Sequence, residues 1–169
     1  KNALVILDDA DVAVAASNAA WGAFLHQGQI CMTTGLVFVH DSIYDAVVAA
    51  LAEKAGHLPV GDPATGQVAL GPIIDDNQVK RIASIVADTV SAGATLQAGG
   101  THEGRYFRPT VLTGVKPGMR SFDEEVFGPV ASVIRFKTKD ELVALATRGE
   151  YGLSLGVITR NTSRGLALA

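Results

Sequence analysis

The sequence predicts an α/β domain with a largely parallel sheet. Short apolar runs rich in β-branched residues alternate with segments that have helical spacing. Several of these runs are continuously apolar, which is typical of parallel strands covered on both faces. The length of 169 residues fits one domain with a sizeable core, and neither a repeat nor a linker divides the chain.

The first two elements are a strand and a helix. The apolar run at 4–7 predicts a buried strand. Asp8, Asp9 and Asp11 then offer a cap and first-turn acids for a helix over about residues 11–26, where negative charge favours the positive end of the helix dipole. Alanine dominates one side of this helix, which predicts close packing.

A second strand and helix follow. The run "GLVFVH" at 35–40 predicts a strand covered on both faces. The segment 41–58 predicts a helix that is capped by Asp41 or Ser42. Apolar residues recur along it at intervals of four, at Ile43, Val47, Leu51 and Ala55.

The middle of the chain begins with a loop. Residues 59–75 are dense in Gly and Pro and predict an ordered loop, after which helical spacing resumes and ends at Gly93. The segments 94–100 and 107–115 predict short strands.

The last third predicts two strands and two helices. "GPVASVIRFK" is an apolar strand, and the next helix has Thr138 as its cap and Glu141 at the capping-box position, ending near Gly149. "LSLGVITR" predicts a further buried strand, and the final residues begin another helix.

Charge and composition exclude several classes of partner. The net charge is −3 and the basic residues are scattered, which argues against a nucleic acid or an anionic membrane as partner. Apolar runs such as "AVVAALA" are too short to span a bilayer. A lone cysteine cannot form an internal disulfide, so we expect a cytoplasmic protein whose partner is a small molecule or another protein chain.

The single cysteine, Cys31, has two interpretations. Most free cysteines are small buried hydrophobes. However, Gly28, Thr33, Thr34 and Gly35 place it in a loop between a helix and a buried strand, where a reactive side chain is typical. Such a loop has free backbone N–H groups that can support a thiolate nucleophile.

A Cys/His hydrolase is one alternative for this cysteine, since it needs only an imidazole base. The candidate bases are His26, His40, His57 and His102. No feature of the sequence orients any of them toward Cys31. The sequence also has neither a serine nucleophile elbow nor a Walker-type phosphate loop.

The second candidate stretch is "SFDEEVFGPV", residues 121–130. It is either a solvated acidic turn with one core phenylalanine or part of a nucleotide site. A carboxylate can accept two hydrogen bonds from a sugar diol while an adjacent aromatic ring packs on a flat heterocycle.

Together these stretches resemble the catalytic domain of the NAD(P)-dependent aldehyde dehydrogenase superfamily. The segments "KNALVILDDADVAVAA", "GQIC", "VGDP…LGP", "FRPTVL" and "EEVFGPV" occur in the family's order and approximate spacing. The resemblance covers nearly all of this chain but only the middle part of a typical member. It implies three layers, with residues 1–169 forming the cysteine-bearing domain of a longer chain that also has a Rossmann domain.

The resemblance also implies roles for single residues. Cys31 matches the family's nucleophile, Glu125 the glutamate that binds the nicotinamide ribose hydroxyls, and Phe127 the aromatic residue beside the nicotinamide. Gln78 matches a position that approaches this ribose in some members, whereas we expect Glu124 to be structural. NAD or NADP is the implied cofactor.

The implied reaction is oxidation of an aldehyde to a carboxylic acid. It proceeds through a thiohemiacetal and a thioester on Cys31, with the oxyanion held by the Cys31 N–H and a side-chain amide. Lys1 aligns with the end of the family's Glu-Leu-Gly-Gly-Lys motif, so we expect the general base upstream of residue 1 and an isolated fragment that is inactive.

Two other functions stay open. An acylating relative would pass the thioester to coenzyme A, and a non-catalytic chain would be a binding or oligomerisation module. The string "FLHQGQICM", with His26 where many members carry Asn, resembles bacterial aromatic aldehyde dehydrogenases of the benzaldehyde, vanillin or salicylaldehyde type. We expect the full-length enzyme to be a homo-oligomer.

Overall fold

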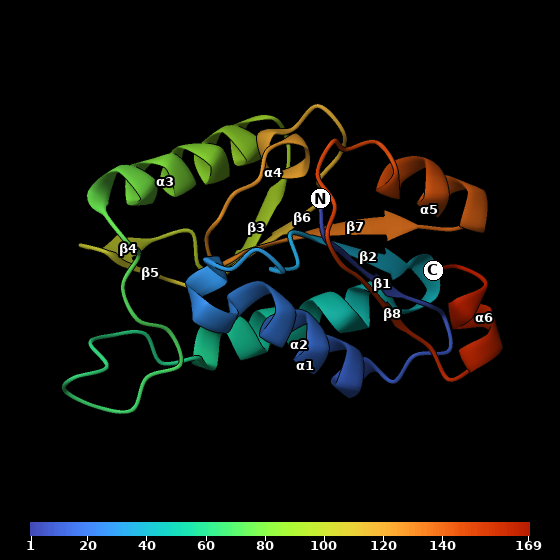
Figure 1. Cartoon of the computed structure of the whole chain (residues 1–169), viewed down its shortest axis with the longest axis horizontal. Coiled ribbons are helices and arrows are strands. Elements are labelled where there is room, and N and C mark those ends of the chain that lie inside the picture. Colours follow the sequence, from blue (N-terminus) through green and yellow to red (C-terminus); the bar gives the residue numbers. More distant parts are fainter.

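The computed structural model describes all 169 residues and has a six-stranded sheet between two layers of helices (Figure 1). In spatial order the strands are β3 (Thr95–Ala98), β6 (Thr110–Thr113), β7 (Val130–Phe136), β2 (Leu36–His40), β1 (Ala3–Ile6) and β8 (Leu155–Ile158). Only β3 runs antiparallel to its neighbour. The predicted α/β fold with a largely parallel sheet is confirmed.

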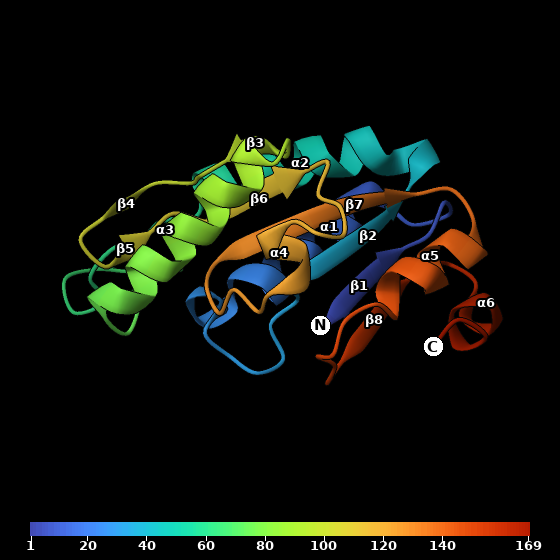
Figure 2. The same ribbon diagram turned by 90° about the horizontal axis from the view of Figure 1, so that it is seen from above.

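The helices divide between the two faces of the sheet, as Figures 1 and 2 show. On one face lie α1 (Val12–Phe24) and α2 (Tyr44–His57). On the other lie α3 (Asp76–Ser91), α4 (Arg120–Asp123) and α5 (Lys139–Ala146). The remaining elements are α6 (Thr162–Leu166), the hairpin β4 (His102–Glu103) and β5 (Tyr106–Phe107), and the 3₁₀ turns η1 (Leu25–Gly28) and η2 (Asp41–Ile43).

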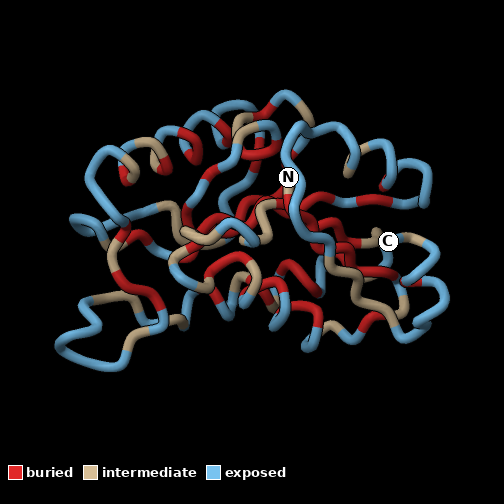
Figure 3. Tube along the Cα trace, in the orientation of Figure 1, coloured by how far each residue is buried: buried red, intermediate tan, exposed pale blue.

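Each face of the sheet has its own hydrophobic core. Along β2, Leu36 and Phe38 face the cluster under α3, α4 and α5, whereas Val37 and Val39 face the cluster under α1 and α2. The buried residues therefore follow the sheet and the inner sides of the helices (Figure 3). This arrangement confirms that β2 is covered on both faces, and it gives the three layers.

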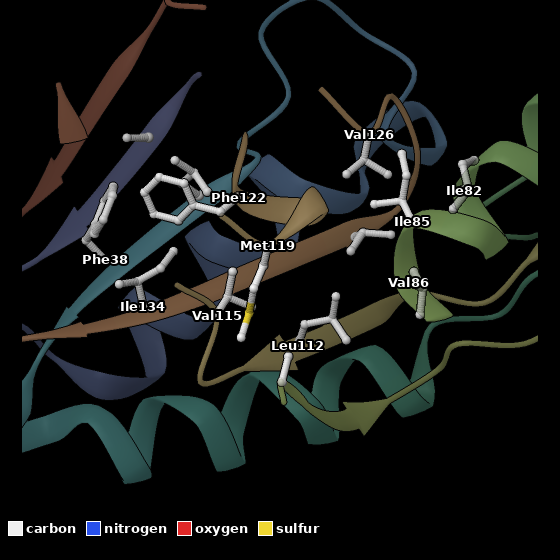
Figure 4. Close-up of a cluster of buried hydrophobic side chains, with 14 of the residues drawn as sticks. Phe38, Ile82, Ile85, Val86, Leu112, Val115, Met119, Phe122, Val126 and Ile134 are labelled. Carbon is white, nitrogen blue, oxygen red and sulfur yellow. The ribbon is translucent and has the colours of Figure 1, made fainter. Parts of the chain in front are cut away.

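The core under α3 and α4 is aliphatic with a few larger side chains (Figure 4). Ile82 and Ile85 point from α3 toward the sheet, and Met119 and Phe122 fill the space between α4 and the strands. Burial of these side chains fixes α3 over the sheet, which matters because α3 supports the candidate site.

The α1–α2 layer relies on small residues. The buried side of α1 consists of Ala15, Ala16, Ala19, Ala20, Ala23 and Phe24. Because alanine side chains are short, the helix lies close to its neighbours. This confirms the close packing expected from the alanine-rich sequence.

Two predicted helix boundaries are wrong. Helix α1 ends at Phe24 rather than 26, because His26 and Gln27 have φ of 51° and 58° in the left-handed region. Helix α5 ends at Ala146 rather than near Gly149. Its Thr138 cap is confirmed and accepts from the N–H of Glu141 at 3.2 Å.

The cap expected for α2 is also wrong. Residues Asp41–Ile43 form a 3₁₀ turn, and the ring of His40 accepts a hydrogen bond from the N–H of Ser42. Asp41 instead binds Arg135 at 2.7 Å. The guanidinium of Arg135 lies 4.0 Å from the ring centroid of Tyr44, so Arg135 of β7 contacts the first residue of α2.

Strand β8 was expected to be buried but lies at the edge of the sheet. It pairs only with β1, and Leu155 is exposed. Val157 and Ile158 are half-buried, one against each of the two cores. No helix in the structure combines the length and the apolar character that a membrane span requires.

The packing of α1 gives a stability prediction. Replacing the fully buried Ala19 with leucine forces extra volume between α1 and its neighbours, so we expect the free energy of unfolding to fall by about 1–3 kcal/mol. The matched change Ala13→Leu lies on the exposed side of the same helix and should alter it by less than about 0.5 kcal/mol. Urea unfolding followed by circular dichroism measures both, and equal losses would contradict the packing described here.

Candidate active site

One pocket of about 210 Å³ brings Cys31, Glu125 and Phe127 together. Its walls come from the segments that precede β1, β2, β7 and β8, so it lies at the amino-terminal ends of parallel strands. Open α/β sheets usually bind ligands at the carboxyl ends instead. The site therefore depends on the loops that enter the strands.

The cysteine loop is fixed by the side chain of Asn2, which is 8% exposed. The Asn2 amide donates to the carbonyl oxygens of Cys31 at 2.7 Å and Thr33 at 3.1 Å. Its oxygen accepts from the N–H groups of Leu153 at 2.9 Å and Ser154 at 3.0 Å. One buried amide thus joins the start of β1, the cysteine loop and the segment before β8.

Cys31 itself is available for chemistry. The residue is exposed and its thiol is free. Its backbone N–H donates to no protein acceptor, so an oxygen atom bound beside the sulfur can receive that hydrogen bond. These features favour the reactive interpretation of Cys31 over that of a buried hydrophobe.

A second anchor links the cysteine loop to the segment before α3. The Gln29 side-chain oxygen accepts from the N–H of Ile74 at 2.9 Å. The Gln27 side chain lies beside Gly71. The cysteine loop and the start of α3 are therefore held in register.

The other wall is the turn between α4 and β7. Glu125 is exposed, and its carboxylate makes no hydrogen bond to the protein. Phe127 has φ of 52°, in the left-handed region, and its side chain is 39% exposed. A free carboxylate next to an accessible ring is the arrangement expected for a ribose and a flat heterocycle.

The two walls meet at a pair of glycines. Gly28 has φ of 65°, and a Cβ atom there would overlap the carbonyl oxygen of Gly128. A Cβ atom on Gly128 would in turn overlap the side chain of Ile82. The backbone of the cysteine loop therefore packs directly on the backbone of the turn, with α3 behind it.

Gln78 lies in α3 rather than in the pocket wall. Its side-chain nitrogen donates to the carbonyl oxygens of Val126 at 3.0 Å and Phe127 at 2.8 Å. Both N–H donors of the amide are therefore used by the turn, and only the oxygen stays available to a ligand.

Glu124 is paired with arginines, as its expected structural role requires. It binds Arg120 at 2.6 Å and Arg81 at 3.4 Å. The hydrogen bond from Arg120 lowers the pKa of the Glu124 carboxyl below its ordinary value. The neighbouring Glu125 has no such partner, so the two adjacent glutamates differ in availability.

Lys1 adds a cation to the pocket. Its ammonium group donates to the carbonyl oxygen of Ser121, and its chain crosses Gly35 so closely that a Cβ there would overlap it. Burial lowers the pKa of the Lys1 ammonium to about 8, and the charge of Glu125 partly opposes this shift.

The histidines do not support a hydrolase. None of the four lines the pocket. His40, His57 and His102 bond to groups within a few residues of themselves in the chain, at Ser42, Glu53 and Gly104 respectively. His26 is exposed in the left-handed turn after α1. No imidazole base for Cys31 is present in this pocket.

Comparison with known proteins agrees with this geometry, because the model of the aldehyde dehydrogenase family matches residues 1–169. The chain belongs to the aldehyde dehydrogenase family. The resemblance seen in the five sequence segments is therefore confirmed.

Named relatives of this aldehyde dehydrogenase family chain include two bacterial enzymes. It is 57% identical to vanillin dehydrogenase from Amycolatopsis sp., over 99% of this chain and 35% of that protein. It is 45% identical to an NAD⁺ benzaldehyde dehydrogenase from Pseudomonas putida, over 99% of this chain and 34% of that protein. The chain thus spans about a third of the curated relatives it matches.

A solved structure shows the same fold. Succinate-semialdehyde dehydrogenase from Burkholderia pseudomallei superposes with a TM-score of 0.94 and 39% identity, over 99% of this chain and 36% of that one. The agreement includes the three-layer arrangement of the sheet and its helices.

Sequence reasoning missed three residues that build the site: Asn2, Gln29 and Arg81. Gln29 stands inside the "GQIC" string, so its position next to the cysteine was a usable signal. Asn2 and Arg81 act through contacts with segments distant in the chain, and neither forms a local pattern.

The glycine contact gives a prediction. Gly28→Ala introduces a side chain at a left-handed φ and against the Gly128 carbonyl, so we expect the free energy of unfolding to fall by about 2 kcal/mol or more. Gly56→Ala is the matched control, because Gly56 is in α2 with open space around it. This change should raise the free energy of unfolding by about 0.5–1 kcal/mol. Thermal unfolding distinguishes the two, and a stable Gly28→Ala protein would refute the close approach.

Proposed function

We propose that this chain is the nucleophile-bearing part of an enzyme that oxidises an aldehyde to a carboxylic acid with NAD or NADP. The observation that carries the proposal is the single pocket that holds an exposed Cys31 thiol, the unpaired Glu125 carboxylate and the accessible Phe127 ring. Membership of the aldehyde dehydrogenase family supports it.

The residues present fit a nicotinamide nucleotide. Glu125 has free acceptor oxygens for the two hydroxyls of a ribose, and Phe127 offers a ring face to a flat heterocycle. The oxygen of Gln78 is the only part of its amide left for a ribose hydroxyl. When bound, the nicotinamide supplies a hydride acceptor.

Cys31 begins the reaction as its thiolate, after the thiol proton has been lost to solvent, by attacking the aldehyde carbonyl carbon. A carbon–sulfur bond forms, and the carbonyl electron pair moves to the oxygen, which gives a thiohemiacetal oxyanion on Cys31. The free N–H of Cys31 is placed to donate to that oxygen. A hydride would leave the same carbon for the acceptor that a bound nicotinamide would supply, and the oxyanion electron pair would re-form the carbonyl of a thioester on the sulfur.

Release of the product needs a base to activate water. Glu125 is the only Asp, Glu or His that lines the pocket, and the proposed role of its carboxylate is to bind the ribose. The deacylating base is therefore proposed to come from residues other than these 169. For the same reason, we propose that the isolated 169-residue chain does not turn over.

The substrate class proposed is an aromatic aldehyde. The support comes from the named relatives, which are vanillin dehydrogenase at 57% identity and benzaldehyde dehydrogenase at 45% identity. Either NAD or NADP is compatible with the described residues. A homo-oligomeric enzyme located in the cytoplasm stays a prediction.

A second candidate is transfer of the acyl group to coenzyme A. The observation in its favour is that the pocket has no base for water other than Glu125. A thiol acceptor would make that base unnecessary, since it attacks the thioester as a thiolate. Acid is the product of the first candidate, and an acyl-coenzyme A is the product of the second.

The nucleophile is tested in the full-length enzyme. Cys31→Ala removes the sulfur that forms the covalent bond, so we expect kcat to fall at least about a thousandfold. Cys31→Ser is the conservative partner and should be nearly as inactive. Normal turnover by Cys31→Ala would exclude the proposed mechanism, whereas one equivalent of iodoacetamide bound with loss of activity supports it.

The isolated chain gives a separate test. The 169-residue protein with NAD⁺ and benzaldehyde should show no steady rise in the absorbance of reduced nicotinamide, because the deacylating base is proposed to lie elsewhere. The full-length enzyme under the same conditions is the control. Continuous turnover by the short chain contradicts the proposal, and turnover that requires added coenzyme A favours the acylating alternative.

A further inference from the structure

Three consecutive carbonyl oxygens of the turn before β7 are bound by side chains of α3. Arg81 donates to Glu125 O at 2.8 Å and to Val126 O at 2.9 Å. Gln78 donates to Val126 O at 3.0 Å and to Phe127 O at 2.8 Å. Two side chains from one helical turn therefore fix the backbone of all three residues.

This backbone needs hydrogen bonds from outside the turn, because the side chains of the turn contribute little buried surface. Glu125 and Phe127 are exposed, and only Val126 of the three is buried. The φ of 52° at Phe127 is a left-handed conformation that is unfavourable for a non-glycine residue. Without external donors, the turn has little to hold the ring and the carboxylate in their places.

Arg81 is suited to this task by its shape. A guanidinium group is a planar fork, so its nitrogens can reach two successive carbonyl oxygens at once. The same group lies 3.4 Å from the Glu124 carboxylate, which balances its charge. A lysine at this position has one nitrogen and cannot reproduce the fork.

The far side of Glu124 is also fixed to α3. Arg120 binds Glu124 at 2.6 Å and donates to Ser84 at 2.8 Å, and it forms an ion pair with Asp88. Arg120 thus connects α4 to α3 and restrains the start of the turn at Glu124.

Arg81 restrains the next two residues of the turn, Glu125 and Val126, through their carbonyl oxygens.

Helix α3 is connected to the cysteine loop as well. Gln29 accepts from the N–H of Ile74, two residues before the helix begins. The segment from Ile74 to Arg81 therefore touches the cysteine loop at one end and the Glu125 turn at the other. Loss of the two Arg81 hydrogen bonds is therefore expected to move the Glu125 turn relative to Cys31.

We propose that Arg81 is a positioning residue, which sets where Glu125 and Phe127 stand relative to Cys31 by binding two carbonyl oxygens of their turn. The inference rests on the proposed function for its effect on catalysis. Its structural half, the restraint of the turn, is independent of any reaction.

The first readout needs no activity. Hydrogen–deuterium exchange followed by mass spectrometry on the cofactor-free full-length protein reports opening of the turn at residues 124–129. We expect Arg81→Met to raise exchange there by about tenfold and Arg81→Lys to raise it less, while exchange in β2 stays unchanged. Lys80→Met is the matched control, since Lys80 is the exposed neighbour of Arg81 on the same helix.

The second readout is kinetic. We expect Arg81→Met to raise KM for NAD⁺ about tenfold with a smaller fall in kcat, because Glu125 and Phe127 are displaced while Cys31 is untouched. Lys80→Met should leave both constants unchanged. If Arg81→Met is too unstable to measure, the same comparison is made with Arg81→Lys, for which we expect about a threefold rise.

The outcomes separate the two proposals. Unchanged exchange at 124–129 in the Arg81 variants overturns the positioning role even if KM rises, because the arginine would then act by direct contact with the cofactor. Raised exchange with unchanged KM also overturns it, because the turn would not control binding. Full activity of Cys31→Ala, by contrast, refutes the proposed function and leaves the restraint of the turn measurable by exchange.

Discussion

The whole site depends on a backbone-to-backbone contact between the cysteine loop and the turn before β7. Gly28 meets the carbonyl of Gly128, and Gly128 meets Ile82 of α3, so no side chain separates the nucleophile's loop from the residues proposed to bind the cofactor. A Cβ atom at Gly28 would push the two walls of the pocket apart, and a Cβ atom at Gly128 would push the turn away from Ile82 of α3. The sheet contributes by placing β2 and β7 side by side, with Leu36 opposite Ser132, so that the loops entering both strands arrive at the same place.

Hydrogen bonds from polar side chains then hold these loops in place. Asn2 uses both ends of one amide to join three segments, and Gln29 connects the cysteine loop to the start of α3. The buried Asn2 amide fixes these segments specifically, because an unpaired donor or acceptor would be costly in the interior. The groups proposed to react, the Cys31 thiol and the Glu125 carboxylate, are left unpaired. Structural and chemical polar groups are thus separated within one small region.

The local sequence pattern was sufficient to predict the strands and helices, but not how far each is buried or which distant residues it contacts. Apolar runs located β2 and β7 to within two residues, because burial on both faces leaves a continuous signal. The same signal misled at β8, which has a strand partner on one side only and whose residues are exposed or half-buried. The end of α1 was missed because His26 and Gln27 adopt a left-handed backbone without being glycine. Cys31, Glu125 and Phe127 were recognisable from their motifs, whereas Arg81 acts on carbonyl oxygens 44 and 45 residues away, which no local spacing reveals.

The position of β1 has a consequence for how the domain is made. This strand lies between β2 and β8, so Ala3 has one partner nearby in the chain, Leu36, and another much further along it, Leu155. Until β8 is synthesised, one edge of β1 is an unpaired row of amide and carbonyl groups, which can recruit a strand from another nascent chain. The pocket's own walls, in contrast, are complete once β7 has formed, apart from the segment that Asn2 holds beside β8. The second edge of β1 is therefore paired later in synthesis than β2 and β7, whose preceding segments form two walls of the pocket.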